Sequence, residues 1–215
     1  MNLTSLKSMK NGDKKITMLT CYDASFAKIL ESINVDALLV GDSLGMFIKG
    51  DINTHNVSLN DMIYHTRAVA RGAKSTFIIS DLPIHTYENN HLAYESALAL
   101  IKVGASMVKL EGGASIAPVV QHLKAKDINV CGHIGFMPQF TQGMNHTQIE
   151  DAMKKALETI IEDASELERS GVDMLVLSSI PESIAKKSRK QYQFPLLDSI
   201  QAKPVTVKFL FCMTY

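Results

Sequence analysis

The chain has 215 residues, 46% of them hydrophobic and 20% charged, and its 22 basic and 22 acidic residues give a formal net charge of zero. This balance argues against nucleic acid or an anionic membrane surface as a partner, and the lack of a long apolar run argues against a membrane span or a secretory signal. The three widely spaced cysteines fit a reducing compartment better than a disulfide framework or a zinc site, so we expect a cytoplasmic protein.

Taken in chain order, the predicted elements alternate between strands and helices. After a short polar helix from Thr4, buried strands are expected at residues 16–21, 37–41, 76–80, 107–111, 129–133 and 173–177. Helices are expected at residues 24–33, 58–71, 90–103, 116–126 and 148–170, with Asp23 and Ser58 as N-caps and Pro181 in the first turn of a further helix. The segment 45–57 is expected to be irregular. This alternation predicts a parallel sheet.

Two parallel architectures fit six strand–helix units, a doubly wound sheet and an eight-stranded barrel. The first strand lacks a Gly-x-Gly-x-x-Gly turn, and polar groups follow many strands instead of gathering at one switch point, which favours the barrel. Such a barrel usually needs about 250 residues. We therefore predict a single α/β domain over residues 1–215, a TIM-type (β/α)₈ barrel that is one or two units short at its C-terminus.

Three consecutive predicted strands end in a carboxylate, and these are Asp42, Asp81 and Glu111. Because the carboxyl ends of neighbouring barrel strands meet at one rim, we expect the three side chains to converge. Carboxylates gathered without cysteine or a histidine pair suit Mg²⁺ better than Zn²⁺. Taken singly, each aspartate could instead be a helix cap or a turn former.

Two further residues belong to this predicted rim. Lys109 precedes Glu111 by two residues, so both side chains point to the same face of their strand. Beside a carboxylate and a metal ion, Lys109 would hold an anionic substrate group such as a carboxylate; the alternative is a structural ion pair inside the barrel. His133 ends the fifth strand and is either a substrate contact or a hydrogen-bonded structural group.

Several short segments stand in an order and spacing that match a known family. They are Val40–Gly45, Tyr64–His65 through Arg71–Gly72, Ser80–Pro83, Val108–Gly113 and Cys131–Gly135 with Pro138–Gln139. With these segments the chain resembles the ketopantoate hydroxymethyltransferase (3-methyl-2-oxobutanoate hydroxymethyltransferase) family from about Met18 to Ala185.

The resemblance implies a (β/α)₈ barrel, commonly a homodecamer, that transfers a one-carbon unit from 5,10-methylenetetrahydrofolate to 3-methyl-2-oxobutanoate. The product is ketopantoate, for pantothenate and coenzyme A synthesis. It further implies that Asp42, Asp81 and Glu111 hold Mg²⁺ directly or through water, and that Ser43 and Lys109 contact the substrate carboxylate. A cation chelated by the keto and carboxylate oxygens would stabilise the enolate formed when the C3 proton leaves.

The chain departs from the family pattern at two places. Ser178 stands where the resemblance implies a glutamate general base, so no catalytic base is assigned, and losing a positioned base typically costs roughly 10²–10⁴-fold. Residues 195–215 form an aberrant tail, in which 201–215 match no family segment. A shifted reading frame from Ala202 can encode the family's Asp-Gly-Gln-Val-Leu-Val, so we predict a frameshifted or truncated chain with impaired activity, whose Phe209–Phe211 could pair with an open sheet edge.

Two other functions stay open. The chain could be a non-catalytic remnant of the family that binds metal or keto acid. It could also be a different magnesium-dependent keto-acid enzyme of the lyase-like barrels, for which carbon–carbon cleavage without folate would be the evidence.

Overall fold

The computed structural model describes residues 1–10, 15–135, 145–178, 180, 192–198 and 209–210. The strands are β1 (Met18–Thr20), β2 (Ala37–Val40), β3 (Phe77–Asp81), β4 (Met107–Glu111), β5 (Val130–Gly135), β6 (Met174–Ser178), β7 (Leu196–Asp198) and β8 (Phe209–Leu210). The helices are α1 (Leu3–Met9), α2 (Ala24–Ser32), α3 (Leu44–Phe47), α4 (Leu59–Gly72), α5 (Asn90–Lys102), the 3₁₀ helix η1 (Ala114–Ile116), α6 (Ala117–Lys124) and α7 (His146–Arg169).

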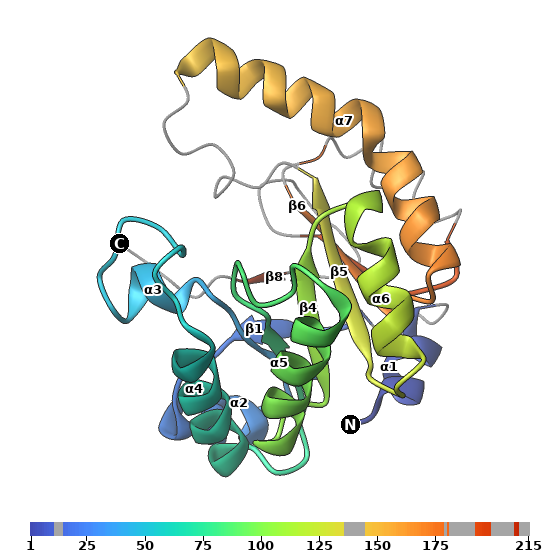
Figure 1. Cartoon of the computed structure of the whole chain (residues 1–215). Coiled ribbons are helices and arrows are strands. Elements are labelled where there is room, and N and C mark those ends of the chain that lie inside the picture. Colours follow the sequence, from blue (N-terminus) through green and yellow to red (C-terminus); the bar gives the residue numbers. More distant parts are fainter. Residues whose placement is uncertain (11–14, 136–144, 179, 181–191, 199–208, 211–215) are drawn as a thin grey trace.

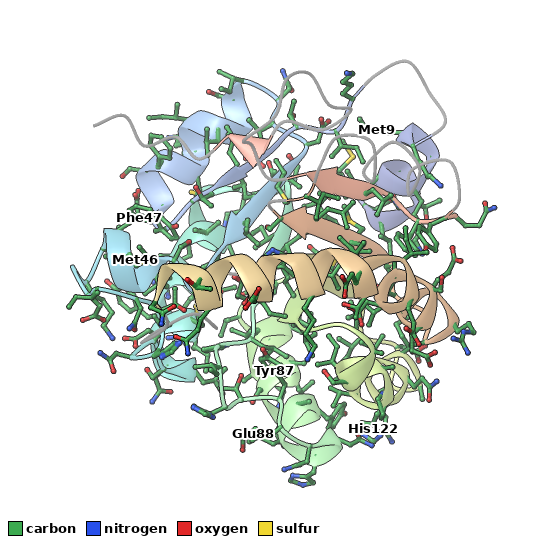
Figure 2. All side chains as sticks on the ribbon, turned by 90° about the horizontal axis from the view of Figure 1, so that it is seen from above. Met9, Met46, Phe47, Tyr87, Glu88 and His122 are labelled. Atoms are coloured by element: carbon green, nitrogen blue, oxygen red, sulfur yellow. The ribbon has the colours of Figure 1, made fainter. Side chains whose placement is uncertain are left out.

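The strands form one curled parallel sheet in the order β7-β6-β5-β4-β3-β2-β1-β8. Figure 1 shows helices α2, α4, α5 and α6 outside the curl, and in the view from above the strands lie centrally with α5 and α6 on one outer side (Figure 2). Within the described residues the two outermost strands, β7 and β8, are not paired with each other. The predicted TIM-type barrel is thus confirmed in an incomplete form.

Strand alternation divides the core into two clusters. One lies inside the curl and contains Met18, Ala37, Leu39, Phe77, Ile79, Met107, Cys131, Met174, Val176 and Leu197, with Leu6 of α1 packed against it. The residues between these positions, such as Leu38, Ile78 and Val108, pack outward against the helices. Side chains on alternate residues of a strand point to the same face. The residues two positions after the inner cluster on β3, β4, β5 and β6 therefore also point inward, at the carboxyl rim of the sheet.

Local sequence signals set the helix starts. Asp23 accepts a hydrogen bond from the Phe26 N–H, and Ser58 forms a capping box with Asp61, as predicted. A second capping box, between Asn145 and Gln148, begins α7. These caps fix where α2, α4 and α7 begin.

The structure differs from the predicted elements in a few places. The segment 45–57 was expected to be irregular, but α3 begins inside the turn after β2 and ends at Phe47. In the tail, Phe209–Leu210 pairs with β1 as an edge strand, as predicted. The helix expected at Pro181, most of the tail, and Gln139 with its loop lie outside the described residues. No described helix has the length and apolarity needed to cross a membrane.

Candidate active site

The inner rim of the sheet gathers the predicted site residues through strand register. Asp81 pairs with Lys109 across β3 and β4, and Glu111 pairs with His133 across β4 and β5. Ser178 ends β6 opposite Gly135. Each of these side chains points to the same face of its strand as the inner apolar cluster. This face changes from apolar residues such as Ile79 and Met107 to charged residues two positions further along the strand. Ser178 was predicted to follow the strand, but it is the strand's last residue.

Lys109 connects two of the predicted carboxylates. Its Nζ lies 2.9 Å from Oδ2 of Asp81 and 3.4 Å from Oε1 of Glu111, with the lysine and aspartate side chains 5% exposed and the glutamate 10%. The backbone N–H of Asp42 donates to the same Oδ2 of Asp81 at 3.1 Å. The predicted ion pair is therefore present, and contact between Lys109 and a substrate carboxylate stays a prediction.

Burial and mutual charge perturb the ionisation of this cluster. Burial, reinforced by the charge of Asp81, raises the pKa of Asp42 to about 8, so this carboxyl carries a proton at neutral pH. Burial opposes ionisation of Glu111, but the charges of Lys109 and His133 outweigh it and lower its pKa to about 2. Burial also opposes the charge on Lys109, yet the surrounding carboxylates outweigh it and raise the lysine pKa. Lys109 and Glu111 are therefore ionised at neutral pH.

A second hydrogen-bonded series begins at Glu111. Its Oε1 lies 2.7 Å from Nδ1 of His133, and Nε2 of His133 lies 2.5 Å from Oγ of Ser178. The three residues come from β4, β5 and β6 and run along the rim. His133 is thus hydrogen-bonded at both ring nitrogens, and its contact with substrate stays a prediction.

Two carboxylate oxygens at the rim are candidate ligands for a cation. Oδ1 of Asp81 and Oε2 of Glu111 are buried and accept no hydrogen bond among the described residues. Buried carboxylate oxygens without partners are hard ligands of the kind Mg²⁺ takes. In the described part of the chain, however, no three His, Cys, Asp or Glu side chains are gathered in a metal-binding arrangement. The cation prediction therefore has two candidate ligand atoms and no preformed three-ligand group.

Two tyrosines at the rim were not found from the sequence. The hydroxyl of Tyr22 lies 2.8 Å from Oγ of Ser43, and Nδ1 of His65 contacts the Tyr22 carbonyl oxygen at 2.7 Å. Tyr22 packs with the outer core cluster, although it stands four residues after Met18 of the inner one, so the period of β1 alone does not place it. His65, predicted to be a packing or surface residue, is part of this contact.

Tyr87 belongs to the loop between β3 and α5, where Figure 2 labels it beside Glu88. Its hydroxyl donates to the backbone carbonyl of Glu111 at 3.2 Å. Burial raises the pKa of Tyr87 to about 12, so this hydroxyl keeps its proton. The loop thereby fixes the backbone at the end of β4 from the outer side of the rim.

Comparison with known proteins places this rim in a family. The model of the family described as ketopantoate hydroxymethyltransferase matches residues 1–206, which extends beyond the stretch Met18–Ala185. The chain belongs to this family. Ketopantoate hydroxymethyltransferases are transferases, and the rim of Asp81, Lys109 and Glu111 is the candidate active site of this member.

Individual relatives agree with the family assignment. The chain is 42% identical over 198 residues to the 3-methyl-2-oxobutanoate hydroxymethyltransferase of Nitrosococcus oceani, covering 92% of this chain and 75% of that protein. It is also 42% identical over 197 residues to the enzyme of the same name from Ruthia magnifica, covering 92% and 76%. The chain thus spans about three quarters of the length of these relatives.

Solved structures with low identity support the barrel fold. A phosphonopyruvate hydrolase in complex with oxalate and Mg²⁺ superposes with a TM-score of 0.71 at 14% identity, covering 98% of this chain and 81% of that one. A 2,3-dimethylmalate lyase of the PEP mutase/isocitrate lyase superfamily gives 0.66 at 18% identity, covering 96% and 80%. At these identities the likeness shows the fold alone.

Proposed function

We propose that this chain transfers a hydroxymethyl group from 5,10-methylenetetrahydrofolate to 3-methyl-2-oxobutanoate, giving ketopantoate. Family membership supports the reaction class. The observation that carries the proposal is the buried cluster of Asp81, Lys109 and Glu111 at the carboxyl rim of the sheet. A 2-keto acid needs a partner for its carboxylate and stabilisation of the negative charge that develops on its keto oxygen when C3 loses a proton. This rim is where the chain gathers the groups for both tasks.

Mg²⁺ is the proposed cofactor, and when bound it supplies Lewis-acid stabilisation of that oxygen. Asp42, Asp81 and Glu111 would hold the ion, directly or through water. The two unpaired oxygens on Asp81 and Glu111 support this assignment, and so does the raised pKa of Asp42. Carboxyl groups that repel one another and lie out of water are stabilised when a cation joins them.

The chain's own residues are proposed to bind and orient the keto acid. Ser43, held by the Tyr22 hydroxyl, and Lys109, held by Asp81, would contact its carboxylate. Both are held by neighbours from other segments of the chain, so little side-chain entropy is lost when substrate binds. His133 lies beside Glu111 and completes the set of proposed substrate contacts.

The activity is proposed to be lower than that of relatives with a carboxylate at the end of β6. Ser178 takes that place here, and an unassisted hydroxyl is a poorer proton acceptor than a carboxylate. We also propose that the protein acts in the cytoplasm as a homo-oligomer, as the family resemblance implies; size-exclusion chromatography with light scattering tests the assembly.

The deciding experiment is an assay of ketopantoate formation from the keto acid, the folate and Mg²⁺. Asp81→Asn should lower the rate by at least about 10²-fold, because it weakens a proposed ligand of the cation and the ion pair that holds Lys109 in place. Asp36→Asn is the matched control, since Asp36 is 2% exposed at the opposite end of β2 and accepts from Thr17. Equal rates for the two variants would refute the assignment of the rim.

A second measurement separates the enzyme from a non-catalytic remnant. Mg²⁺ with 3-methyl-2-oxobutanoate should raise the melting temperature, because a ligand that binds the native state stabilises it by mass action. A raised melting temperature without product would favour the remnant. Product formed by carbon–carbon cleavage without folate would favour a lyase.

A further inference from the structure

Tyr22 lies beside one of the two proposed contacts for the keto-acid carboxylate. Its hydroxyl is 2.8 Å from Oγ of Ser43, and the tyrosine as a whole is 8% exposed. Tyr22 comes two residues after β1 and Ser43 three residues after β2, and these two strands are paired. The contact therefore joins the carboxyl ends of neighbouring strands at the rim that carries the candidate site.

Backbone and packing contacts hold the tyrosine in place. Nδ1 of His65, on α4, lies 2.7 Å from the Tyr22 carbonyl oxygen, and because a carbonyl only accepts, this nitrogen carries the hydrogen. The two rings meet edge-on with their centroids 6.5 Å apart, and Tyr22 packs in the outer core cluster. The hydroxyl of Tyr22 is thus carried by a side chain whose backbone and ring are both held.

The Ser43 hydroxyl lies close to the charged cluster of the rim. A Cβ added at Gly41 would be 2.7 Å from Ser43 Oγ and 3.6 Å from Oδ2 of Asp81, so both oxygens lie against this glycine. The same Oδ2 pairs with Lys109, the other proposed carboxylate contact. Through Ser43, Tyr22 therefore reaches the part of the rim where the substrate carboxylate is proposed to bind.

The number of available hydrogens decides the direction of these hydrogen bonds. A carboxylate only accepts, so Ser43 can bind it only by donating its single hydroxyl hydrogen. Tyr22 must then be the donor to Ser43 Oγ, and a phenol, being more acidic than an aliphatic alcohol, is the stronger donor of the two. Thr20, whose side chain also hydrogen-bonds to Tyr22, can supply the hydrogen that the tyrosine oxygen accepts.

We propose that Tyr22 is a positioning residue for keto-acid recognition, whose hydroxyl donates to Ser43 and so directs the Ser43 hydrogen at the substrate carboxylate. This inference rests on the proposed function and adds to it a residue that acts through Ser43. Without the tyrosine hydroxyl, Ser43 loses the donor that orders its own hydrogen, and part of the binding free energy is lost in ordering it.

The test is a double-mutant cycle on the binding of 3-methyl-2-oxobutanoate in Mg²⁺ buffer, measured by isothermal titration calorimetry. Tyr22→Phe removes only the hydroxyl and should weaken binding about tenfold, as expected for one lost hydrogen bond. Ser43→Ala should weaken binding by at least as much. In the Ser43→Ala background, Tyr22→Phe should have no further effect, because its effect passes through the Ser43 hydroxyl.

Turnover gives an independent readout. Contact with the substrate carboxylate is made in the ground state and in the transition state alike, so Tyr22→Phe should raise KM about tenfold and leave kcat nearly unchanged. A fall in kcat with KM unchanged would overturn the inference. Binding of Mg²⁺ alone should be the same in Tyr22→Phe and in the unchanged protein, because Tyr22 is not among the proposed ligands.

Tyr192→Phe is the matched control. Tyr192 is 2% exposed and stands four residues before β7; its hydroxyl donates to the Ile161 carbonyl at 2.8 Å and lies 3.1 Å from Oγ of Ser165. This variant also removes a buried phenol hydroxyl beside a serine, but away from the carboxyl rim. It should bind the keto acid as tightly as the unchanged protein does.

The outcomes separate this inference from the proposed function. If Ser43→Ala weakens binding and Tyr22→Phe does not, the role of Tyr22 is overturned and the proposed function stands. Equal losses from Tyr22→Phe with and without the Ser43 hydroxyl also overturn it, because the tyrosine would then act through the fold or on the substrate itself. No effect of Ser43→Ala overturns the inference together with the proposed Ser43 contact. An unchanged protein that binds no keto acid overturns both the inference and the proposed function.

Discussion

Removal of the Lys109 charge tests the electrostatic account of the rim most directly. In Lys109→Met the aliphatic volume is largely kept, but Asp81 and Glu111 lose their shared cation. At an effective dielectric constant of about 20, the charges of Lys109 and Glu111, 3.4 Å apart, attract by about 5 kcal/mol, while burial raises the pKa of Asp81 and weakens its share of the attraction. Burial of the charged groups offsets several kcal/mol of this attraction. We therefore expect a net loss of about 3–5 kcal/mol at neutral pH, the usual cost of leaving a buried charge without its partner.

The stability difference between Lys109→Met and the unchanged protein should depend on pH. In the unchanged protein the pKa of Glu111 is lowered to about 2, so its contribution to stability is present above the unfolded pKa and is lost as the pH falls toward 2. Without Lys109 the buried carboxyls shift to higher pKa values, so the folded state binds more protons and the variant gains stability as the pH falls. The gap between variant and unchanged protein should narrow in acid.

Thermal unfolding without added ligands measures both effects. A loss of this size lowers the melting temperature by about 10 °C at neutral pH in a domain of this length. Lys102→Met is a suitable control, because Lys102 lies in the last turn of α5, outside the buried rim. Equal melting temperatures for Lys109→Met and the unchanged protein, or a gap that widens in acid, would refute the account.

Three further predictions concern other parts of the molecule. Asp173→Asn should lower the free energy of unfolding by about 2 kcal/mol at neutral pH, because Asp173 is buried at the other rim and pairs with Lys7 and Lys124. The pKa of Asp173 is lowered, so the difference in unfolding free energy between variant and unchanged protein should fade as the pH falls, and denaturant unfolding measures it. Gly41→Ala should raise the KM for keto acid about fivefold, since a Cβ would meet Ser43 Oγ at 2.7 Å and displace the hydroxyl. Chelation of divalent ions should lower the melting temperature measured in Mg²⁺ buffer, and no change would count against a bound cation.

The fold was predictable from the sequence because its signals are local. The caps at Asp23 and Ser58 involve residues three apart, and buried strands bounded by glycine or aspartate show as short apolar runs. The short helix α3 was missed, because Leu44 stands between Gly41-Asp42-Ser43 and Gly45, a pattern typical of a turn.

The site was predictable only in part. Strand endings place Asp81, Glu111 and His133 on one rim, and the period of β4 puts Lys109 on the same face. What the sequence leaves open is which partner each group contacts. The link from Glu111 through His133 to Ser178 depends on register across three strands, over 67 residues of chain from Glu111 to Ser178. No local pattern encodes that pairing.

The energetics of the rim connect these points. A strand that is apolar at Met107 and charged at Lys109 and Glu111 places ionic groups directly above an apolar interior. Such groups lower stability unless they are paired. Two carboxylate oxygens of the rim have no hydrogen-bond partner among the described residues, and the pKa of Asp42 is raised to about 8. An arrangement that costs stability within an otherwise well-packed barrel is expected where binding or catalysis needs it. The same imbalance is the reason to expect a divalent cation to stabilise this fold.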